Sequence, residues 1–144
     1  ASLTEAFAQL FRRLTDEMGK TIVFSTTDAA LADRCATHAA LLIAGKVREA
    51  HTGPLESLRE GLDKRLYILE TSDDPAARAA IERAFPALRA EGDESLSIYG
   101  EKADAPEPSA LLGALEAAGI EARCFARSEP SLAEAMKAAV KEAT

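Results

Sequence analysis

The residues best suited to chemistry form a short polar turn at residues 25–28, with the sequence Ser-Thr-Thr-Asp. The turn follows a β-branched, apolar stretch that predicts a strand over Thr21–Ser25, and it precedes a helical pattern. Small hydroxyls and a carboxylate between a strand and a helix are typical of nucleotide sites, which raises the question of whether this turn contacts a nucleotide. The ordinary alternative is a helix N-cap, in which Thr27 or Asp28 accepts hydrogen bonds from first-turn amides.

Other groups with chemical potential have simpler structural interpretations. His38 and His51 have no further ligands at suitable spacing, so we expect them at strand ends rather than in a metal site. The carboxylates Glu70, Asp73 and Asp74 fit a strand end followed by a helix cap, where negative charge is favourable.

The two cysteines, Cys35 and Cys124, are far apart in the sequence and form no CxxC motif. This usage predicts two buried free thiols in a reducing compartment rather than a disulfide framework.

The elements that must position the turn occupy the first third of the chain. A helical stripe begins at Leu3, and Ser2 with Glu5 three residues later fits a capping box. After the predicted strand and turn, an apolar pair of segments around Ala44-Gly45 indicates a hairpin. The predicted elements are a helix at 3–18, a strand at 21–25, a helix at 28–35 and hairpin strands at 38–43 and 46–50.

The rest of the chain has a β-α-β-β-α-β order of predicted elements between residues 65 and 127. This is the split βαβ, or ferredoxin-like, arrangement, in which two helices cover one face of a four-stranded antiparallel sheet. A closing helix follows, with Ser131 and Glu134 as its capping box and Leu132, Met136 and Val140 as its apolar stripe. The predicted strands are 65–70, 88–90, 94–99 and 120–127. The predicted helices are the one over 74–85, a second one that is capped by Ser109 and ends at Gly119, and the closing helix.

Charge and hydropathy separate the chain into regions and exclude some partners. The net charge is −7, and all of that excess lies beyond His51. An acidic surface repels phosphate backbones, which argues against nucleic acid as a partner. The apolar run at 39–44 is too short to span a bilayer, and the first residues do not form a secretory signal, so we expect a cytoplasmic protein that does not enter a membrane.

The change in charge and the punctuation at residues 51–54 predict where the regions divide. The predicted domains are a first module over 1–52, a linker helix over 53–62 and a second module over 63–144.

Several spaced motifs in the first module carry a resemblance to a known family. The segment from Phe11 to Val47 contains Gly-Lys-Thr at 19–21, Ser-Thr at 25–26 followed by Asp28, Leu-Leu at 41–42 and Gly-Lys-Val at 45–47. In this order it resembles the C-terminal part of the ATP-binding subunit of an ABC transporter. In that family Ser-Thr-His-Asp is the switch-histidine motif, and the resemblance places Thr27 and Asp28 at the switch loop.

The second module resembles the same family. Exporter-type ABC ATPases often carry a small C-terminal domain that ends in a Pro-Ser-Leu-Glu-Asp-Val-Phe helix, and the segment EPSLAEAMKAAV at 129–140 is similar to that ending. The resemblance implies an α/β (α+β) chain. It would consist of an incomplete P-loop NTPase-type C-terminal segment, then a ferredoxin-like βαββαβ accessory domain with a C-terminal helix.

The chain also departs from the family pattern. Thr27 occupies the position of the switch histidine, and Thr37-His38 replaces an Asp-Arg pair. The GxxxxGK[ST] phosphate loop, the Ser-Gly-Gly signature and a Walker-type Asp-Glu pair do not occur in the sequence. ATP hydrolysis needs these groups, so we expect the 144-residue chain alone to have no ATPase activity and no catalytic residue of its own.

The resemblance implies ATP and Mg²⁺ as cofactors of an intact parent, and a membrane-spanning transporter subunit as its partner. The parent would lie at the inner face of the membrane. A second hypothesis is a stand-alone ferredoxin-like regulatory, small-ligand-binding or dimerisation module without an ATP role, because that architecture serves many functions. Under either hypothesis, the unpaired strand edge in residues 20–50 predicts a homodimer in solution.

Overall fold

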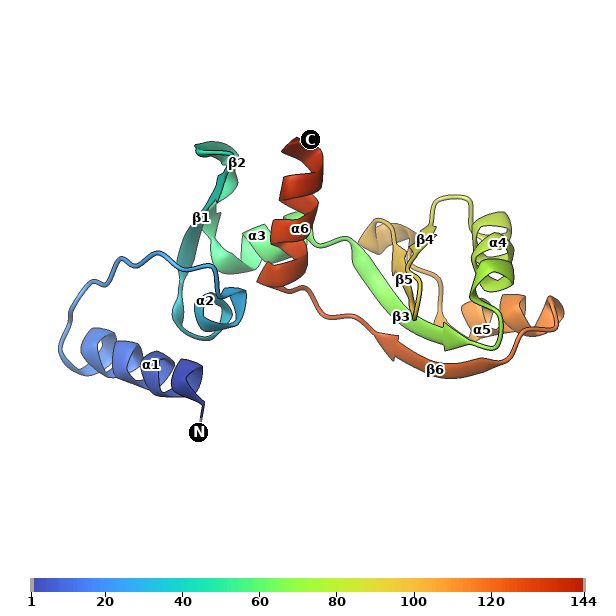
Figure 1. Ribbon diagram of the computed structural model, residues 1–144, viewed down its shortest axis with the longest axis horizontal. Helices are drawn as coiled ribbons and strands as arrows, with labels where there is room; N and C mark the ends of the chain where they lie inside the picture. Colours follow the sequence, from blue (N-terminus) through green and yellow to red (C-terminus); the bar gives the residue numbers. More distant parts are fainter. Residues whose placement is uncertain (1, 144) are drawn as a thin grey trace. The chain divides into compact units, whose positions relative to one another are not determined.

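The computed structural model describes residues 2–143 and divides the chain into two compact units (Figure 1). Unit 1 contains the residues up to Asp63 and those from Pro130 onward, and unit 2 contains Lys64–Glu129. Each unit combines helices with one antiparallel sheet. The predicted mixed α+β class is therefore confirmed.

Unit 1 begins with a helix that fits the predicted pattern. Ser2 caps it by accepting a hydrogen bond from the Glu5 amide over 3.2 Å, as the capping box predicts. The helix continues into a π-helical turn at Arg13–Glu17. The elements of unit 1 are α1 (Leu3–Arg12), α2 (Ala29–Cys35), β1 (His38–Ile43), β2 (Lys46–Pro54), α3 (Leu55–Leu62) and α6 (Leu132–Ala143).

The core of unit 1 joins segments from both ends of the chain. Figure 1 shows α6 beside α3, and α6 also contacts α2 and β1. Half of the buried side chains are alanines, which allow the helices to approach closely. The cluster comprises Ala32, Leu41, Leu55, Leu132, Ala135 and Ala139.

The predicted strand over Thr21–Ser25 is wrong. This stretch has no regular secondary structure, and Val23 is 93% exposed. Phe24 does pack, with its ring centroid 5.1 Å from that of Phe11. A strand forms only where neighbours pair with its N–H and C=O groups, and across residues 2–143 the only sheet of unit 1 is the β1–β2 hairpin.

The hairpin itself is confirmed, although β2 is longer than predicted. Ala44 and Gly45 both have positive φ, at 51° and 74°, as a tight two-residue hairpin turn requires. The sequence predicts a break at residues 51–54 and a linker helix over 53–62. Residues 51–54 instead belong to β2, because Thr52, Gly53 and Pro54 pair with β1. The helical part of that linker is α3, which starts at Leu55.

Unit 2 has the element order that the sequence predicts. Its strands form one antiparallel sheet in the order β4-β5-β3-β6. Asp73 caps the first helix by accepting from the Ala76 amide. The elements are β3 (Arg65–Thr71), α4 (Asp74–Ala84), β4 (Arg89–Glu91), β5 (Leu96–Tyr99), a 3₁₀ turn (Lys102–Asp104), α5 (Pro108–Ala117) and β6 (Ala122–Arg127).

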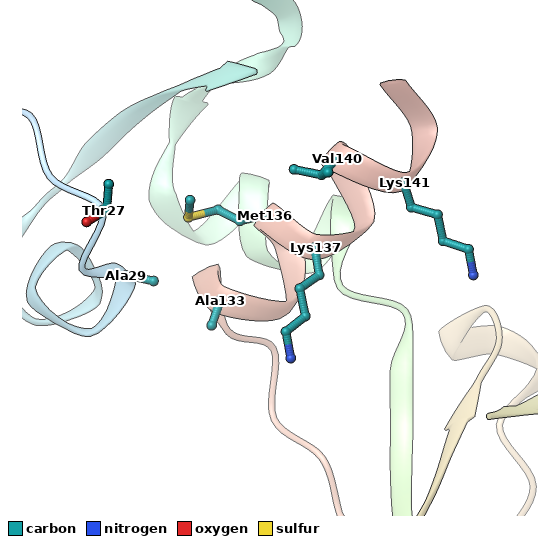
Figure 2. A pocket seen from close by; sticks show the side chains of 7 residues that line it. All are labelled: Thr27, Ala29, Ala133, Met136, Lys137, Val140 and Lys141. Carbon is teal, nitrogen blue, oxygen red and sulfur yellow. The ribbon is translucent and has the colours of Figure 1, made fainter. Parts of the chain in front are cut away.

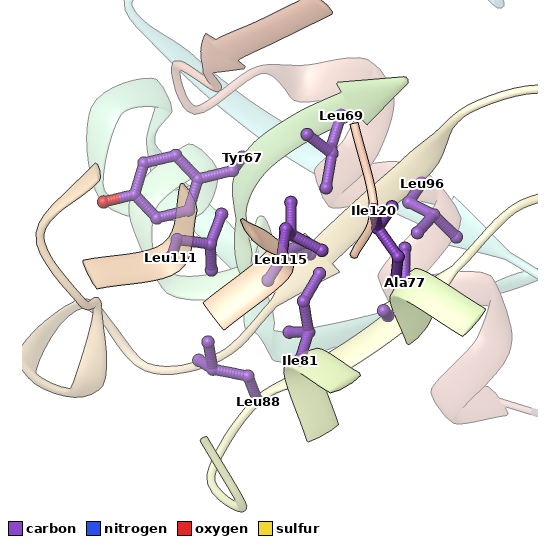
Figure 3. Packing of buried hydrophobic residues seen from close by; sticks show 11 residues of the cluster. Tyr67, Leu69, Ala77, Ile81, Leu88, Leu96, Leu111, Leu115 and Ile120 are labelled. Atoms are coloured by element: carbon purple, nitrogen blue, oxygen red, sulfur yellow. The ribbon is translucent and has the colours of Figure 1, made fainter. Parts of the chain in front are cut away.

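The core of unit 2 lies between one face of this sheet and its two helices (Figure 3). Alternating residues of β3 and β5 point to the same side, where they meet the apolar faces of α4 and α5. Leu69, Ile81, Leu96, Ile98 and Leu111 are all fully buried there. Unit 2 therefore has a complete core of its own.

Two local predictions in unit 2 need correction. Cys124, expected to be buried, is exposed, because a bulge at Arg123 shifts the register: Cys124 lies opposite Glu70, and Phe125 takes the core-facing position. Helix α5 begins at Pro108 rather than behind a Ser109 cap, since proline suits the first helical position.

The structure also divides the chain differently from the predicted domains. The closing helix α6, predicted to belong to a domain over 63–144, is part of unit 1. Leu132 is 2% exposed within the core of unit 1, and α6 contacts α3 more extensively than any other element. The capping box of α6 is confirmed, since Ser131 Oγ accepts from the Glu134 amide over 3.2 Å.

Candidate functional site

Asp28 is the N-cap of α2. Its Oδ1 accepts hydrogen bonds from the amides of Ala30 and Leu31, over 3.0 and 3.2 Å, and its Oδ2 accepts from Thr4 Oγ1 over 3.2 Å. The Asp28 amide donates to Thr26 Oγ1 over 2.9 Å. The helix-cap interpretation of the turn is therefore confirmed for Asp28, and its carboxylate occupies the amides that an anion would otherwise contact.

We expect Asp28→Ala to lower the free energy of unfolding of unit 1 by about 1 kcal/mol, because two first-turn amides lose their acceptor. Asp28→Asn keeps an acceptor oxygen and should cost less. Urea unfolding followed by circular dichroism measures both. Thr27→Ala is the matched control, since the Thr27 side chain takes no part in the cap, and a loss as large as that of Asp28→Ala would contradict the assignment.

Thr27 lies on one side of an open groove of about 500 Å³ between the start of α2 and one face of α6 (Figure 2). Ala29 lies beside it, and Ala133, Met136 and Val140 line the opposite side. Val140 is 49% exposed, so the predicted apolar stripe of the closing helix is only partly covered. The groove is thus mostly apolar, with one hydroxyl group.

The charged groups of the groove are two lysines one helical turn apart on α6. Figure 2 shows the ammonium groups of Lys137 and Lys141 directed away from the apolar side chains of Met136 and Val140. Lys137 also forms an ion pair with Glu134 over 3.0 Å. The lining residues include no carboxylate, imidazole or thiol, so the groove offers contact surface rather than acid–base chemistry.

The remaining candidates do not assemble into a site. No group of three or more histidine, cysteine or acidic residues that could hold a metal occurs among residues 2–143. His38 is exposed on β1, whereas His51 is 2% exposed, and its Nε2 lies 3.7 Å from Glu142 Oε2. Asp74 accepts from Thr71 Oγ1 over 2.6 Å at the end of β3, whereas the predicted cap of α4 is formed by Asp73.

Cys35, at the end of α2, is half-buried and donates to the Leu31 carbonyl over 3.0 Å. Burial raises the pKa of its thiol, and the nearby guanidinium of Arg12 offsets part of this effect. A protonated thiol at neutral pH is a poor nucleophile.

The structure adds two residues that sequence reasoning missed. Asp33 Oδ2 accepts a hydrogen bond from the Leu132 amide over 3.1 Å, and Asp63 Oδ2 accepts from the Ser131 amide over 2.9 Å. These carboxylates hold the first residues of α6. No local signal identifies such pairs, because the partners lie 99 and 68 residues apart in the sequence.

Comparison with protein families, curated proteins and solved structures finds no match. Within residues 2–143, no helix has the length and apolar character needed to cross a membrane.

Proposed function

We propose that this chain is the C-terminal part of the ATP-binding subunit of an exporter-type ABC transporter. Residues 1–52 would complete the nucleotide-binding core, with Thr27 and Asp28 at its switch loop. ATP and Mg²⁺ would be bound by the parent, which would drive a membrane-spanning partner from the cytoplasmic face. The remaining residues would serve in contacts or regulation rather than in chemistry.

The observation that carries this proposal is the stretch Thr21–Ser25. Its β-branched and aromatic sequence suits a strand buried in a parallel sheet, yet it has no strand partner among residues 2–143 and leaves Val23 93% exposed. An intact nucleotide-binding core would supply that sheet. The stretch leads directly into the Asp28 cap and α2, in the order that the family resemblance requires.

The architecture of unit 2 supports the accessory domain in this proposal. Unit 2 has the element order β-α-β-β-α-β and an antiparallel sheet with the strand order β4-β5-β3-β6. A split βαβ arrangement has the same features. These features support the proposal that unit 2 is a ferredoxin-like accessory domain.

One observation favours the second hypothesis, a stand-alone regulatory or ligand-binding module. Unit 2 encloses its own core of fully buried side chains, so it has the organisation of an independent domain. Saturable, Mg²⁺-independent binding of a small molecule by the isolated chain would favour this hypothesis.

The decisive measurement is the intact mass of the native polypeptide, followed by nucleotide assays on the longer chain. We expect a species much heavier than 15.3 kDa that carries Walker-type sequence and binds ATP with Mg²⁺. In that longer chain, Thr27→His should raise ATP turnover by about 100-fold or more, because histidine supplies a longer, protonatable arm at the phosphate.

Ser25→His is the matched control for this substitution. It places the same side chain in the same exposed turn, but outside the switch position, and should leave turnover unchanged. A native product of 15.3 kDa, or a longer chain that neither binds nor hydrolyses ATP, would overturn the proposal.

A further inference from the structure

We infer that Asp33 is a positioning residue that couples the start of α6 to the turn that presents Thr27. Asp33 lies one helical turn after Ala29, on the side of α2 that meets α6. Its Oδ2 accepts from the Leu132 amide over 3.1 Å, and its Oδ1 lies 3.4 Å from Arg59 Nη1. One carboxylate therefore contacts both α6 and α3.

The packing around this hydrogen bond extends the coupling along α2. Ala32 belongs to the same buried cluster as Ala135 and Ala139 of α6. At the start of α2, Thr27 and Ala29 line the groove opposite α6. Helix α2 has only seven residues, and so short a helix is not stable in water without packing. Helix α1 supplies part of that packing, and Thr4 of α1 donates to the Asp28 carboxylate. The Asp28 cap and the position of Thr27 therefore depend on α6 as well as on α1.

The start of α6 is in turn held by side chains from elsewhere in unit 1. Asp63, the C-cap residue of α3, is 7% exposed and accepts from the Ser131 amide over 2.9 Å. The next amide, that of Leu132, donates to Asp33 of α2. Two successive amides at the start of α6 are therefore held by carboxylates from two different helices. A displacement of residues 130–132 would break the Asp33 hydrogen bond and loosen the contact of α2 with α6, leaving α2 held by α1 alone.

This inference rests on the proposed function only in treating Thr27 as a switch position. In that setting, Asp33 would transmit a movement of residues 130–132, at the start of α6, to the turn that presents Thr27. The coupling is a property of unit 1 alone and can be measured without nucleotide.

The test is amide hydrogen exchange, followed by NMR, in the full 144-residue chain. Asp33→Ala should reduce the protection of the Leu132 amide and of the capped Ala30 and Leu31 amides by at least about tenfold. Amides in the core of unit 2, such as that of Leu69, should keep their protection. Asp104→Ala, in an exposed 3₁₀ turn of unit 2, is the matched control and should change none of them.

Rescue separates positioning from a general structural role. Asp33→Asn keeps a side-chain oxygen that accepts from Leu132, so it should restore most of the protection at Ala30 and Leu31. If the Leu132 amide loses protection while Ala30 and Leu31 keep theirs, α2 is held without α6 and the inference is overturned.

A second measurement covers the case in which Asp33→Ala unfolds unit 1. In the wild-type chain under mild urea, the Leu31 and Ala135 amides should open with the same free energy and the same dependence on urea. Opening of Leu31 alone would overturn the coupling. Because no nucleotide is present, failure here leaves the transporter proposal standing, and a longer chain that fails to bind ATP leaves the coupling standing.

Discussion

Replacement of Leu111 by alanine should lower the free energy of unfolding of unit 2 by about 2–5 kcal/mol, which is the range for a fully buried leucine. Leu111 is 0% exposed and packs from α5 into the core of unit 2. Its removal costs the transfer free energy of the side chain and leaves a cavity that the sheet can fill only in part. Chemical denaturation followed by NMR amide signals of unit 2 measures the loss.

The adjacent residue is the matched control for this substitution. Leu112 occupies the next position of α5 and is 36% exposed, so Leu112→Ala should cost clearly less than Leu111→Ala. Equal losses for the two variants would contradict the orientation of α5 against the sheet.

The second large effect is expected from a chain that ends at Glu129. This change removes Leu132, Ala135 and Ala139 from the core of unit 1 and uncovers Leu41 and Leu55. The loss of Leu132 alone costs about 2–5 kcal/mol, against a total stability of about 5–15 kcal/mol for a typical domain. We therefore expect unit 1 to lose its cooperative unfolding transition, while unit 2 retains its own.

A chain that ends at Glu142 is the control for this truncation, because it keeps all three buried residues of α6. NMR spectra should show dispersed amide signals for β1 and β2 in this control but not in the chain that ends at Glu129. Retention of those signals in the shorter chain would mean that α6 is dispensable for unit 1.

Much of the fold could be predicted from the sequence wherever a local signal determines the structure. The caps at Ser2, Asp28, Asp73 and Ser131 use a side chain and an amide only two or three residues apart. The β-α-β-β-α-β order of unit 2 follows from alternating apolar positions and punctuation. In each case the interaction that forms the element is contained within the segment that was analysed.

The predictions that failed concern interactions between distant segments. The stretch Thr21–Ser25 has strand propensity, but a strand is defined by neighbours that its own residues do not specify. Ile120 and Ala122 face the core as predicted, but beyond the bulge at Arg123 the opposite side of β6 is buried. Simple alternation does not include such an insertion.

The candidate site illustrates the same limit. The identity of Asp28 as a helix cap was predictable, because its acceptor role is local. The groove beside Thr27 and the role of Asp33 were not, because α6 reaches them from about a hundred residues away in the sequence.

The division of unit 1 into two segments has a consequence for biosynthesis. Translation proceeds from the N-terminus, so every residue of unit 2 is made before the segment from Pro130 onward that completes unit 1. All residues of the unit 2 core are therefore synthesised before the last residues of the unit 1 core. Until α6 is made, Leu41 and Leu55 lack the helix that helps to bury them. The unit whose synthesis begins first is therefore the last to have all of its residues.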